Sequence, residues 1–580
     1  MLEYDSTFND LQPTTTMKKI FSGTIVLLVS CFLISLTSCD RLLSVDTDRF
    51  LRSDEVLLNS PNDTVFSILG ILAKMQKLAD RTVLTGELRA DLMDVTVNTS
   101  NEVRDLNNYT IDSLTSPFSD VRDYYAIINN CNYFIRKADT MVTVRGERVF
   151  KKEISTAKTI RAWTYLQLGL NHGEATYYSD PILSVEDLTK VHPLLNPTQL
   201  IDSLINEMEL MDPINNTAIP QYGTINNVTS RYLFVNPLFL LGDLYLWKAS
   251  QTHNTADYER SAFYYGKLIE MNKYVANSNG ITWRDATYTG WNDSWTSALT
   301  NTSSSTEWIS LLKLVTSPYD GTASKIGTMC TNFELCASPV YLNNSNNQTY
   351  CFREGTGTIK LSSGDLRAKS LLKTTIINTY TNESQVLINK YADNVYSIYR
   401  VALLYLRYAE AVNRSGKPNL AFAVLKYGLN SSTLSLVDRV PANELVDQKP
   451  YVTFFRGDDY TNNAGIHSRG SGSSMYNTMY FIPNYTRQVL VNNVWTNSTD
   501  SLDLVAAKND TINFVESAIC DELALETPFE GNRFQDLMRM SDNREDPKFL
   551  ATKVAQKHSM NYDYYFNLLK ERKNWYIKPH

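Results

Sequence analysis

Four aromatic residues gather in one polar stretch of the chain. Trp283, Tyr288, Trp291 and Trp295 stand among Asn, Asp, Ser, Thr and Gly. Sugar rings present apolar C–H faces that stack on aromatic rings, while their hydroxyl groups need amide, carboxylate or guanidinium partners. This mixture is typical of a sugar-binding site. The same rings could equally pin the segment to a scaffold, so both interpretations stay open at this point.

Catalytic patterns find little support in the sequence. None of the six histidines stands in an H-E-x-x-H pattern, and no G-x-S-x-G turn occurs. The glycine-rich residues 470–472 lack the G-K-[ST] ending of a phosphate loop, so His467 and Arg469 beside them are interpreted as loop anchors or ligand contacts. A pair of carboxylates for glycoside hydrolysis is defined by spacing in three dimensions, which the sequence does not give. We expect no enzymatic activity and no cofactor.

Composition indicates a folded protein that does not bind nucleic acid. Apolar residues make up 43% and charged residues 20% of the 580 residues, which favours packed domains over disorder. Lys and Arg total 55 against 62 Asp and Glu, a net charge of −7, whereas nucleic-acid binding needs a clustered basic surface. A chain of this length requires two or more domains or one repeat array.

The N-terminal region has the layout of a lipoprotein signal. Lys18 and Lys19 precede an apolar run from Ile20 to Leu36, and Leu-Thr-Ser-Cys follows with its cysteine at Cys39. The run is short for a membrane span and resembles a secretory signal with a bacterial lipobox. Cleavage before Cys39 would leave its thiol to carry lipid. We therefore predict a lipidated protein that is anchored through Cys39.

Five cysteines remain after the signal and the lipidated cysteine are set aside. Because five is odd, at least one thiol is unpaired, and three of the five are close enough in sequence for one local disulfide. Their spacing lacks the C-x2-C pattern or the neighbouring histidine of a zinc site, so we expect no metal. The five are Cys131, Cys330, Cys336, Cys351 and Cys520.

Apolar residues at spacings of three and four predict helices over residues 121–138, 153–170, 198–211, 230–249 and 257–271. Thr198 is interpreted as the cap of the third, and the fourth is expected to start or kink at Pro237. A further helical hairpin is predicted where Gly416 ends one helix and Pro418 begins the next. Because the pairs do not recur at a constant period, the pattern indicates a helical array with insertions.

These patterns divide the chain into seven segments. Two of them lack helical pattern and are rich in polar and aromatic residues, so we expect them to carry the binding surface. In chain order the segments are an upstream extension and signal (1–38), a lipidated tether (39–55), an N-terminal helical scaffold (56–275), a loop-rich insertion with the aromatic cluster (276–395), a helical hairpin (396–434), an irregular insertion (435–512) and a C-terminal segment (513–580).

Charged residues of alternating sign follow one another near the C-terminus. They predict a partly buried ion network that fixes the helical array, with Arg533 and Asp536 side by side. Arg407 and Glu410 are three residues apart on a predicted helix, so they can pair with each other or with a neighbouring helix. The C-terminal set is Glu526, Glu530, Arg533, Asp536 and Arg539.

Four stretches together resemble the SusD/RagB family of outer-membrane nutrient-uptake lipoproteins. They occur in family order after the lipobox and span most of the mature chain. His172 departs from the aromatic residue that the family commonly has there, and Cys39 is followed by Asp40 and Arg41 rather than by a run of acids. The stretches are TAKTIRAWTYLQLGLNHG (156–173), the helix pair within 232–265, YRVALLYLRYAEAVNRSGK (399–417) and ELALETPFEGNRFQDLMR (522–539).

The resemblance implies a mainly α-helical protein, with a tetratricopeptide-like scaffold of helix pairs and large irregular, loop-rich ligand-binding insertions. It implies a surface-exposed outer-membrane lipoprotein that binds an oligosaccharide and delivers it to a SusC-like TonB-dependent transporter. A peptide receptor, a structural partner of the transporter without its own ligand, and a glycoside hydrolase are the rival hypotheses, in that order. The resemblance also points to ligand contacts soon after the first helix, namely Arg81, Asp91, Asn98 and Asn101.

Overall fold

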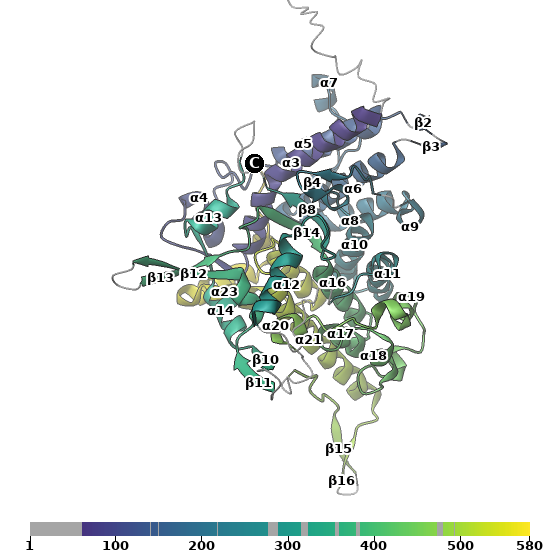
Figure 1. Ribbon diagram of the computed structural model, residues 1–580, viewed down its shortest axis with the longest axis vertical. Coiled ribbons are helices and arrows are strands. Elements are labelled where there is room, and N and C mark those ends of the chain that lie inside the picture. The colour runs from purple at the N-terminus through teal and green to yellow at the C-terminus, as the bar shows by residue number, and fades with distance from the viewer. Residues whose placement is uncertain are drawn as a thin grey trace, which may run out of the picture. The chain divides into compact units, whose positions relative to one another are not determined.

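The computed structural model describes residues 61–580, except 140, 145, 149, 217–218, 277–287, 315–322, 354–358, 379–382, 473–479 and 492–493. The predicted signal, the lipidation site Cys39 and the tether lie outside the described residues, as does Trp283. Within the described part, the chain is mainly helical and its helices pack in pairs, as the sequence predicts (Figure 1).

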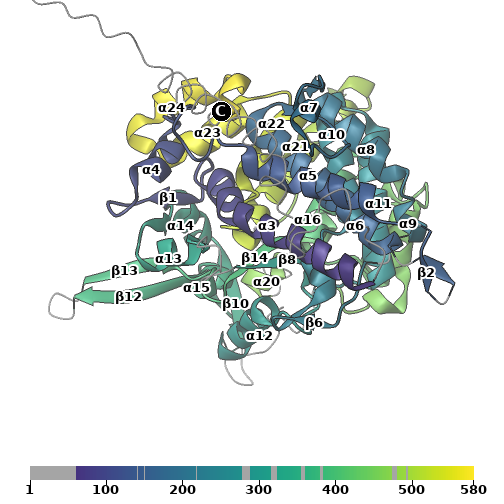
Figure 2. The same ribbon diagram turned by 90° about the horizontal axis from the view of Figure 1, so that it is seen from above.

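The scaffold helices pack first on their neighbours in sequence. They are α3 (Pro61–Glu87), α5 (Arg122–Lys137), α6 (Lys151–His172), α8 (Pro197–Glu209), α10 (Pro237–Thr252), α11 (Thr255–Asn272), α16 (Val401–Arg414) and α17 (Pro418–Lys426). The pairs are α5 with α6, α10 with α11, and α16 with α17. Contacts of α8 with α6 and α10, and of α11 with α16, join the pairs into one array, and α3 packs on α5 and α6 (Figure 2).

Local sequence explains where these helices begin and end. Asn236 caps α10, because its side-chain oxygen accepts hydrogen bonds from the backbone N–H groups of residues 238 and 239, and Pro237 is the first helical residue. The helix thus starts at this point rather than kinking. Gly416, at φ 89°, separates α16 from α17 as predicted. The predicted cap of α8 is wrong: Asn196 caps the helix in place of Thr198, because Pro197 already occupies the first turn.

The insertion 276–395 contains more regular structure than its sequence indicates. One of its strands, β8 (Trp308–Lys313), is buried and pairs antiparallel with β14 (Val395–Arg400), which leads directly into α16. These strands are far apart in sequence, so no local period reveals their pairing. The other elements are α12 (Tyr288–Thr300), α13 (Ile326–Thr331), β9 (Leu335–Ala337), α14 (Pro339–Asn346), β10 (Thr349–Arg353), β11 (Ile359–Ser363), α15 (Leu366–Leu371), β12 (Leu372–Asn378) and β13 (Glu383–Ile388).

The insertion 435–512 is closer to the expected irregular chain. It holds short helical turns and an exposed hairpin, β15 (Gln488–Val491) with β16 (Val494–Asn497), which projects from the helices in Figure 1. The last helical segment begins earlier than predicted, because Asp500 caps α21 (Ser501–Glu526). It continues with α22 (Arg533–Asn543), α23 (Lys548–Lys557) and α24 (Tyr562–Leu569).

Short elements complete the described chain. β1 pairs with β9, β2 with β3, β4 with β5, and β6 with β7, each as an antiparallel pair. They are β1 (Met93–Val95), α4 (Asn101–Asn108), β2 (Thr143–Val144), β3 (Glu147–Arg148), β4 (Ala175–Thr176), α7 (Val185–Leu188), β5 (Leu194–Leu195), α9 (Pro213–Asn216), β6 (Thr224–Ile225), β7 (Val228–Thr229), η1 (Ser230–Leu233), α18 (Ser431–Ser435), η3 (Ala442–Glu444), α19 (Pro450–Thr453), η4 (Phe454–Arg456), η5 (Asp458–Tyr460), α20 (Ser468–Ser471), η7 (Ser559–Asn561) and η8 (Arg572–Trp575).

A fully buried ion network joins the insertion to the C-terminal helices. Glu526 at the end of α21 accepts from Arg367 (2.7 Å), Arg400 (2.8 Å) and Arg469 (3.1 Å). Arg400 also pairs with Glu307 at 2.8 Å and with Glu530 at 2.9 Å. We call these residues, together with Glu522, Asp365 and Lys390, the central ion network. Each of these charges has lost its contact with water, and the opposite charges around it offset the cost of that desolvation.

A second set of ion pairs connects α22 to the helix array. Arg539 pairs with Glu410 on α16 at 2.7 Å, and Asp536 pairs with Arg407 on α16 at 2.6 Å. The predicted C-terminal network is therefore confirmed, and it is fully rather than partly buried. Arg407 and Glu410 take partners on α22 rather than each other. Arg533 takes Asp91 rather than Asp536, because its side chain points toward the segment that follows α3.

The end of α3 is fastened to the turn before α22. Glu87 accepts the backbone N–H groups of Gly531 (2.7 Å) and Phe529 (3.2 Å), and burial raises the pKa of this carboxyl group to about 7. A Cβ atom at Gly86 would lie 1.9 Å from the Gly531 carbonyl oxygen, so only glycine permits this approach. The N-terminal helix and the C-terminal motif thus form one packed unit.

No disulfide joins the five cysteines of the described chain, so the possible local disulfide is not formed. Within the described ranges, no group of side chains is arranged to hold a metal ion. No helix there is both long enough and apolar enough to cross a membrane.

The central ion network predicts a large difference between buried and surface arginines. Arg400→Gln should lower the free energy of unfolding by about 3–5 kcal/mol, because three carboxylates lose their common partner in a buried site. Arg122→Gln is the matched control, since its side chain is 89% exposed and its one ion pair among the described residues is with Asp120. Urea unfolding followed by circular dichroism measures both. Equal stability of the two variants would contradict the role given to the network.

Candidate functional site

The aromatic cluster lies on α12, and its two described indole rings are packed inside the protein. Trp291 and Trp295 stack on each other with ring centroids 5.7 Å apart, and each is 1% exposed. They form an apolar cluster with Ala298 and Leu366. Trp291 also donates its indole N–H to the carbonyl oxygen of Arg469 at 2.8 Å. For Trp291 this geometry favours the packing interpretation over direct stacking on a ligand. Tyr288 begins α12, and its side chain lies outside the described part.

Trp295, unlike Trp291, lines a pocket between α12, α15 and the strands β8 and β14. The pocket has about 500 Å³ of empty space, counted out to the open solvent, and we call it the α12 pocket. Two tryptophans, several hydroxyl and amide groups, one lysine and one carboxylate surround it. Its lining residues are Trp295, Thr296, Leu299, Thr300, Trp308, Ser370, Leu371, Asn389, Lys390, Asp393 and Val395.

Trp308 contributes an unusual group to this pocket. Its side chain is 2% exposed, and its buried indole N–H has no hydrogen-bond acceptor among the described residues. Buried donors without an acceptor are rare and costly, and they mark places where a water molecule or a ligand completes the bonding. Trp308 therefore brings an unsatisfied donor to the lining of the α12 pocket, where Trp295 supplies a second aromatic ring.

The base of the α12 pocket is tied to the central ion network. Lys390 pairs with Glu530 at 2.6 Å, and Glu530 also binds Arg400. Burial lowers the pKa of Lys390, and its pairing with Glu530 opposes that shift. Asp393 is exposed at the rim and is the one carboxylate among the described lining residues, whereas glycoside hydrolysis ordinarily uses two. The arrangement suits binding of a polyhydroxylated ligand.

The four polar residues inferred from the resemblance lie elsewhere. Arg81 donates to the carbonyl oxygen of Asp120 (2.6 Å), and Asp91 is fully buried in its ion pair with Arg533. Asn98 is exposed and donates to the carbonyl oxygen of residue 332 at 3.2 Å, and Asn101 is exposed in the first turn of α4. None of the four lines the α12 pocket as described, and α4 stands apart from α12 in both views (Figures 1 and 2).

The glycine-rich turn near residue 470 anchors the core. His467 bonds through Nδ1 to Glu522 at 2.8 Å, and Arg469 pairs with Glu307 at 2.8 Å inside the central ion network. This supports the loop-anchor interpretation of both residues. The sequence did not indicate Trp308, Asn389 or Asp393, because Trp308 reaches the other two only through the long-range pairing of β8 with β14. A lone tryptophan at the start of a buried strand was the one available signal.

Comparison with solved structures identifies the fold. A SusD superfamily protein from Bacteroides vulgatus aligns with a TM-score of 0.55 at 12% identity, covering 90% of this chain and 96% of its own. A SusD homolog from Bacteroides thetaiotaomicron gives 0.51 at 13% identity, covering 88% and 90%. A Bacteroides vulgatus protein described as a candidate sugar-binding protein gives 0.50 at 16% identity, covering 84% and 88%.

No family model matches the sequence, and no curated protein matches it. The described chain forms an array of helix pairs with inserted strands. Its fold is that of the solved SusD superfamily structures, in agreement with the fold that the four sequence stretches predict.

The α12 pocket predicts effects of different size on stability for changes at its two tryptophans. Trp295→Ala should lower the free energy of unfolding by about 3–5 kcal/mol, because it leaves a cavity in a packed cluster. Trp308→Phe keeps an aromatic ring and removes the unsatisfied N–H, so its stability should stay close to that of the wild type. Thermal and urea unfolding measure both. A large loss of stability in Trp308→Phe would show that its N–H has a structural partner.

Proposed function

We propose that this protein is a non-enzymatic receptor that binds an oligosaccharide and delivers it to a SusC-like TonB-dependent transporter of the outer membrane. The observation that carries the proposal is the α12 pocket, where aromatic walls, an unsatisfied indole donor and amide, hydroxyl and carboxylate groups converge. The SusD fold supports it, because one protein of similar fold is described as a candidate sugar-binding protein. The lipobox at Cys39 supports a location on the membrane surface.

The α12 pocket favours binding of a terminal sugar residue over binding of several consecutive residues of a sugar chain. The Trp308 N–H can donate to a ring hydroxyl, and Asn389 and Asp393 at the rim can accept from others. Trp295 supplies an apolar wall rather than an open face, so shape and hydrogen bonding contribute more than stacking does. The opening toward solvent leaves room for the rest of the oligosaccharide.

Sugar binding should depend on the rim of the α12 pocket. The variant with both Asn389→Ala and Asp393→Ala should bind its glycan about thirtyfold or more weakly with an unchanged melting temperature, because each exposed side chain contributes at least one hydrogen bond of about 1 kcal/mol. Affinity gels cast with a polysaccharide panel identify the glycan, and calorimetry then measures the affinities. No reducing ends should be released.

Asn98→Ala is the matched comparison, since it removes an equally exposed amide from the other predicted site. A loss of binding confined to Asn98→Ala would move the site to the segment between α3 and α4. A protein that binds oligopeptides and no glycan would favour the peptide-receptor hypothesis. A protein that binds neither, yet co-purifies with a TonB-dependent barrel, would be a structural partner.

Membrane attachment should depend on one thiol. Cys39→Ala should leave an unprocessed or soluble protein, because the described chain offers no helix that could hold it in a membrane. Palmitate labelling and membrane fractionation check this outcome. Cys351→Ala is a suitable control, since it removes a buried thiol far along the chain from the lipobox. A Cys39→Ala protein that still labels and stays in the outer-membrane fraction would contradict lipid anchoring.

A further inference from the structure

One buried arginine differs from the others in the described core. Arg89, two residues after the end of α3, is 2% exposed, yet it forms no ion pair with any described residue. Four other arginines that are buried to the same degree have carboxylate partners at 2.7–2.8 Å. These are Arg367 with Asp365, Arg400 with Glu307, Arg469 with Glu307 and Arg539 with Glu410.

The partners of Arg89 are neutral. It donates to the carbonyl oxygens of Thr85 (2.9 Å) and Trp575 (2.7 Å) and to the side-chain oxygen of Asn171 (3.1 Å). Its guanidinium group also lies 4.2 Å from the ring centroid of Phe534. Burial lowers the pKa of Arg89 to about 10, and no carboxylate opposes that shift. At neutral pH the group is therefore a buried cation without a counter-charge from the protein.

Arg89 retains donors that these contacts do not use. A guanidinium group carries five N–H bonds, and the three hydrogen bonds employ one on each nitrogen. One N–H remains on each of the two terminal nitrogens. A buried carboxylate or phosphate group is the partner that this geometry recognises best, because its two oxygens match paired N–H donors.

A large pocket lies beside this cation. It has about 950 Å³ of empty space, counted out to the open solvent, and its walls come from the segment after α4 and from the C-terminal residues 568–578. We call it the Arg89 pocket. Its lining residues are Arg89, Tyr109, Ile111, Asp112, Ser113, Ser119, Leu568, Lys573, Asn574, Tyr576, Ile577 and Lys578.

A second group in the Arg89 pocket also lacks a partner. The Ser119 hydroxyl belongs to a side chain that is 0% exposed, and it has no hydrogen-bond partner among the described residues. Ser119 and Arg89 thus contribute an unsatisfied hydroxyl and an uncompensated positive charge to the same pocket. One anionic group that accepts hydrogen bonds can bind the Ser119 hydroxyl and also balance the charge of Arg89.

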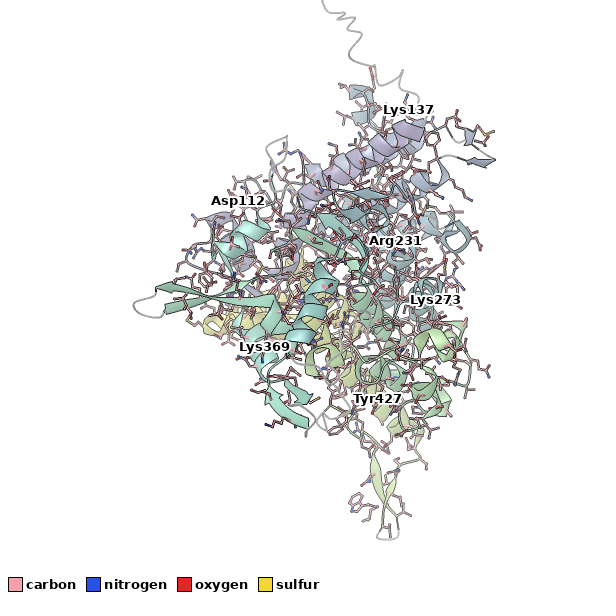
Figure 3. All side chains as sticks on the ribbon, viewed as in Figure 1. Asp112, Lys137, Arg231, Lys273, Lys369 and Tyr427 are labelled. Carbon is pink, nitrogen blue, oxygen red and sulfur yellow. The ribbon has the colours of Figure 1, made fainter. Side chains whose placement is uncertain are left out.

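The mouth of the Arg89 pocket carries further positive charges. Lys573 and Lys578 are exposed there and form no ion pair with a described residue. Asp112, labelled in Figure 3, is also at the mouth, where hydrogen bonds from residues 114 and 115 lower the pKa of its carboxyl group. An ionised Asp112 repels an anion but accepts hydrogen bonds from hydroxyl groups. The ring of Tyr576 stays neutral, because burial raises its pKa to about 12.

We propose that the Arg89 pocket binds a sugar acid, a small molecule that carries one carboxylate and several hydroxyl groups. The carboxylate lies against Arg89 and the Ser119 hydroxyl, and the hydroxyl groups face Asp112 and Asn574. The tyrosine rings of residues 109 and 576 flank its apolar faces. This site is separate from the α12 pocket and does not rest on the receptor function proposed above.

Calorimetry and thermal unfolding of the purified protein test the proposal with three probes at one ionic strength. D-Glucuronate should bind and raise the melting temperature, and D-glucose and inorganic phosphate should do neither at the same concentration. Binding of phosphate but not glucuronate would overturn the sugar-acid assignment. Binding of glucose equal to that of glucuronate would overturn the role of the charge. No binding of any probe would overturn the site.

Variants then locate the binding. Ser119→Ala should weaken glucuronate binding about fivefold and leave the melting temperature of the free protein unchanged, because the hydroxyl has no partner to lose. The pair Lys573→Gln and Lys578→Gln should weaken binding and reduce its dependence on salt. Lys548→Gln removes an exposed charge outside the pocket and should have no effect. Asn389→Ala should leave glucuronate binding intact, which separates this site from the α12 pocket. Normal binding by Ser119→Ala and by the double lysine variant would contradict the assignment.

Discussion

The pairing of buried charges is the constraint on which the rest of this structure depends. Arg400 and Glu526 each bind several opposite charges at once, and they bring together segments that lie more than a hundred residues apart. Removing water from such groups is favourable only when every charge has a partner in good geometry. The network therefore fixes the insertion, the hairpin of α16 and α17, and the C-terminal helices in one arrangement.

The α12 pocket inherits its shape from this network. Lys390 lines the pocket and pairs with Glu530, and Arg469 offers its carbonyl oxygen to Trp291 while its guanidinium group binds Glu307. The walls of the pocket are thus held by contacts that a ligand does not need to form. A site that is rigid before binding loses less conformational entropy when it binds.

The two pockets differ in the charge of the buried group that lacks a partner. In the α12 pocket the buried charge, Lys390, is paired with Glu530, and the unsatisfied buried group is the neutral N–H of Trp308, which suits a ligand rich in hydroxyl groups. In the Arg89 pocket the unsatisfied group is a whole positive charge, which suits an anion. The difference follows from whether nearby elements place a carboxylate beside the buried arginine. The central ion network contains five carboxylates, whereas the surroundings of Arg89 contain carbonyl, amide and phenol oxygens.

The sequence by itself determined the scaffold. Helical spacing, the stop at Gly416 and the start at Pro237 are local signals, and each is confirmed because helix formation and capping depend on nearby residues. The alternating charges around Glu530 predict a buried ion network but not its partners, since Glu530 pairs with the distant Arg400. The tertiary structure decided which side chains meet. It paired Arg533 with Asp91, buried Trp291 and Trp295, and brought Trp308 to Asn389 through the strands β8 and β14. Such meetings depend on how distant segments pack together, and no spacing along the chain encodes them.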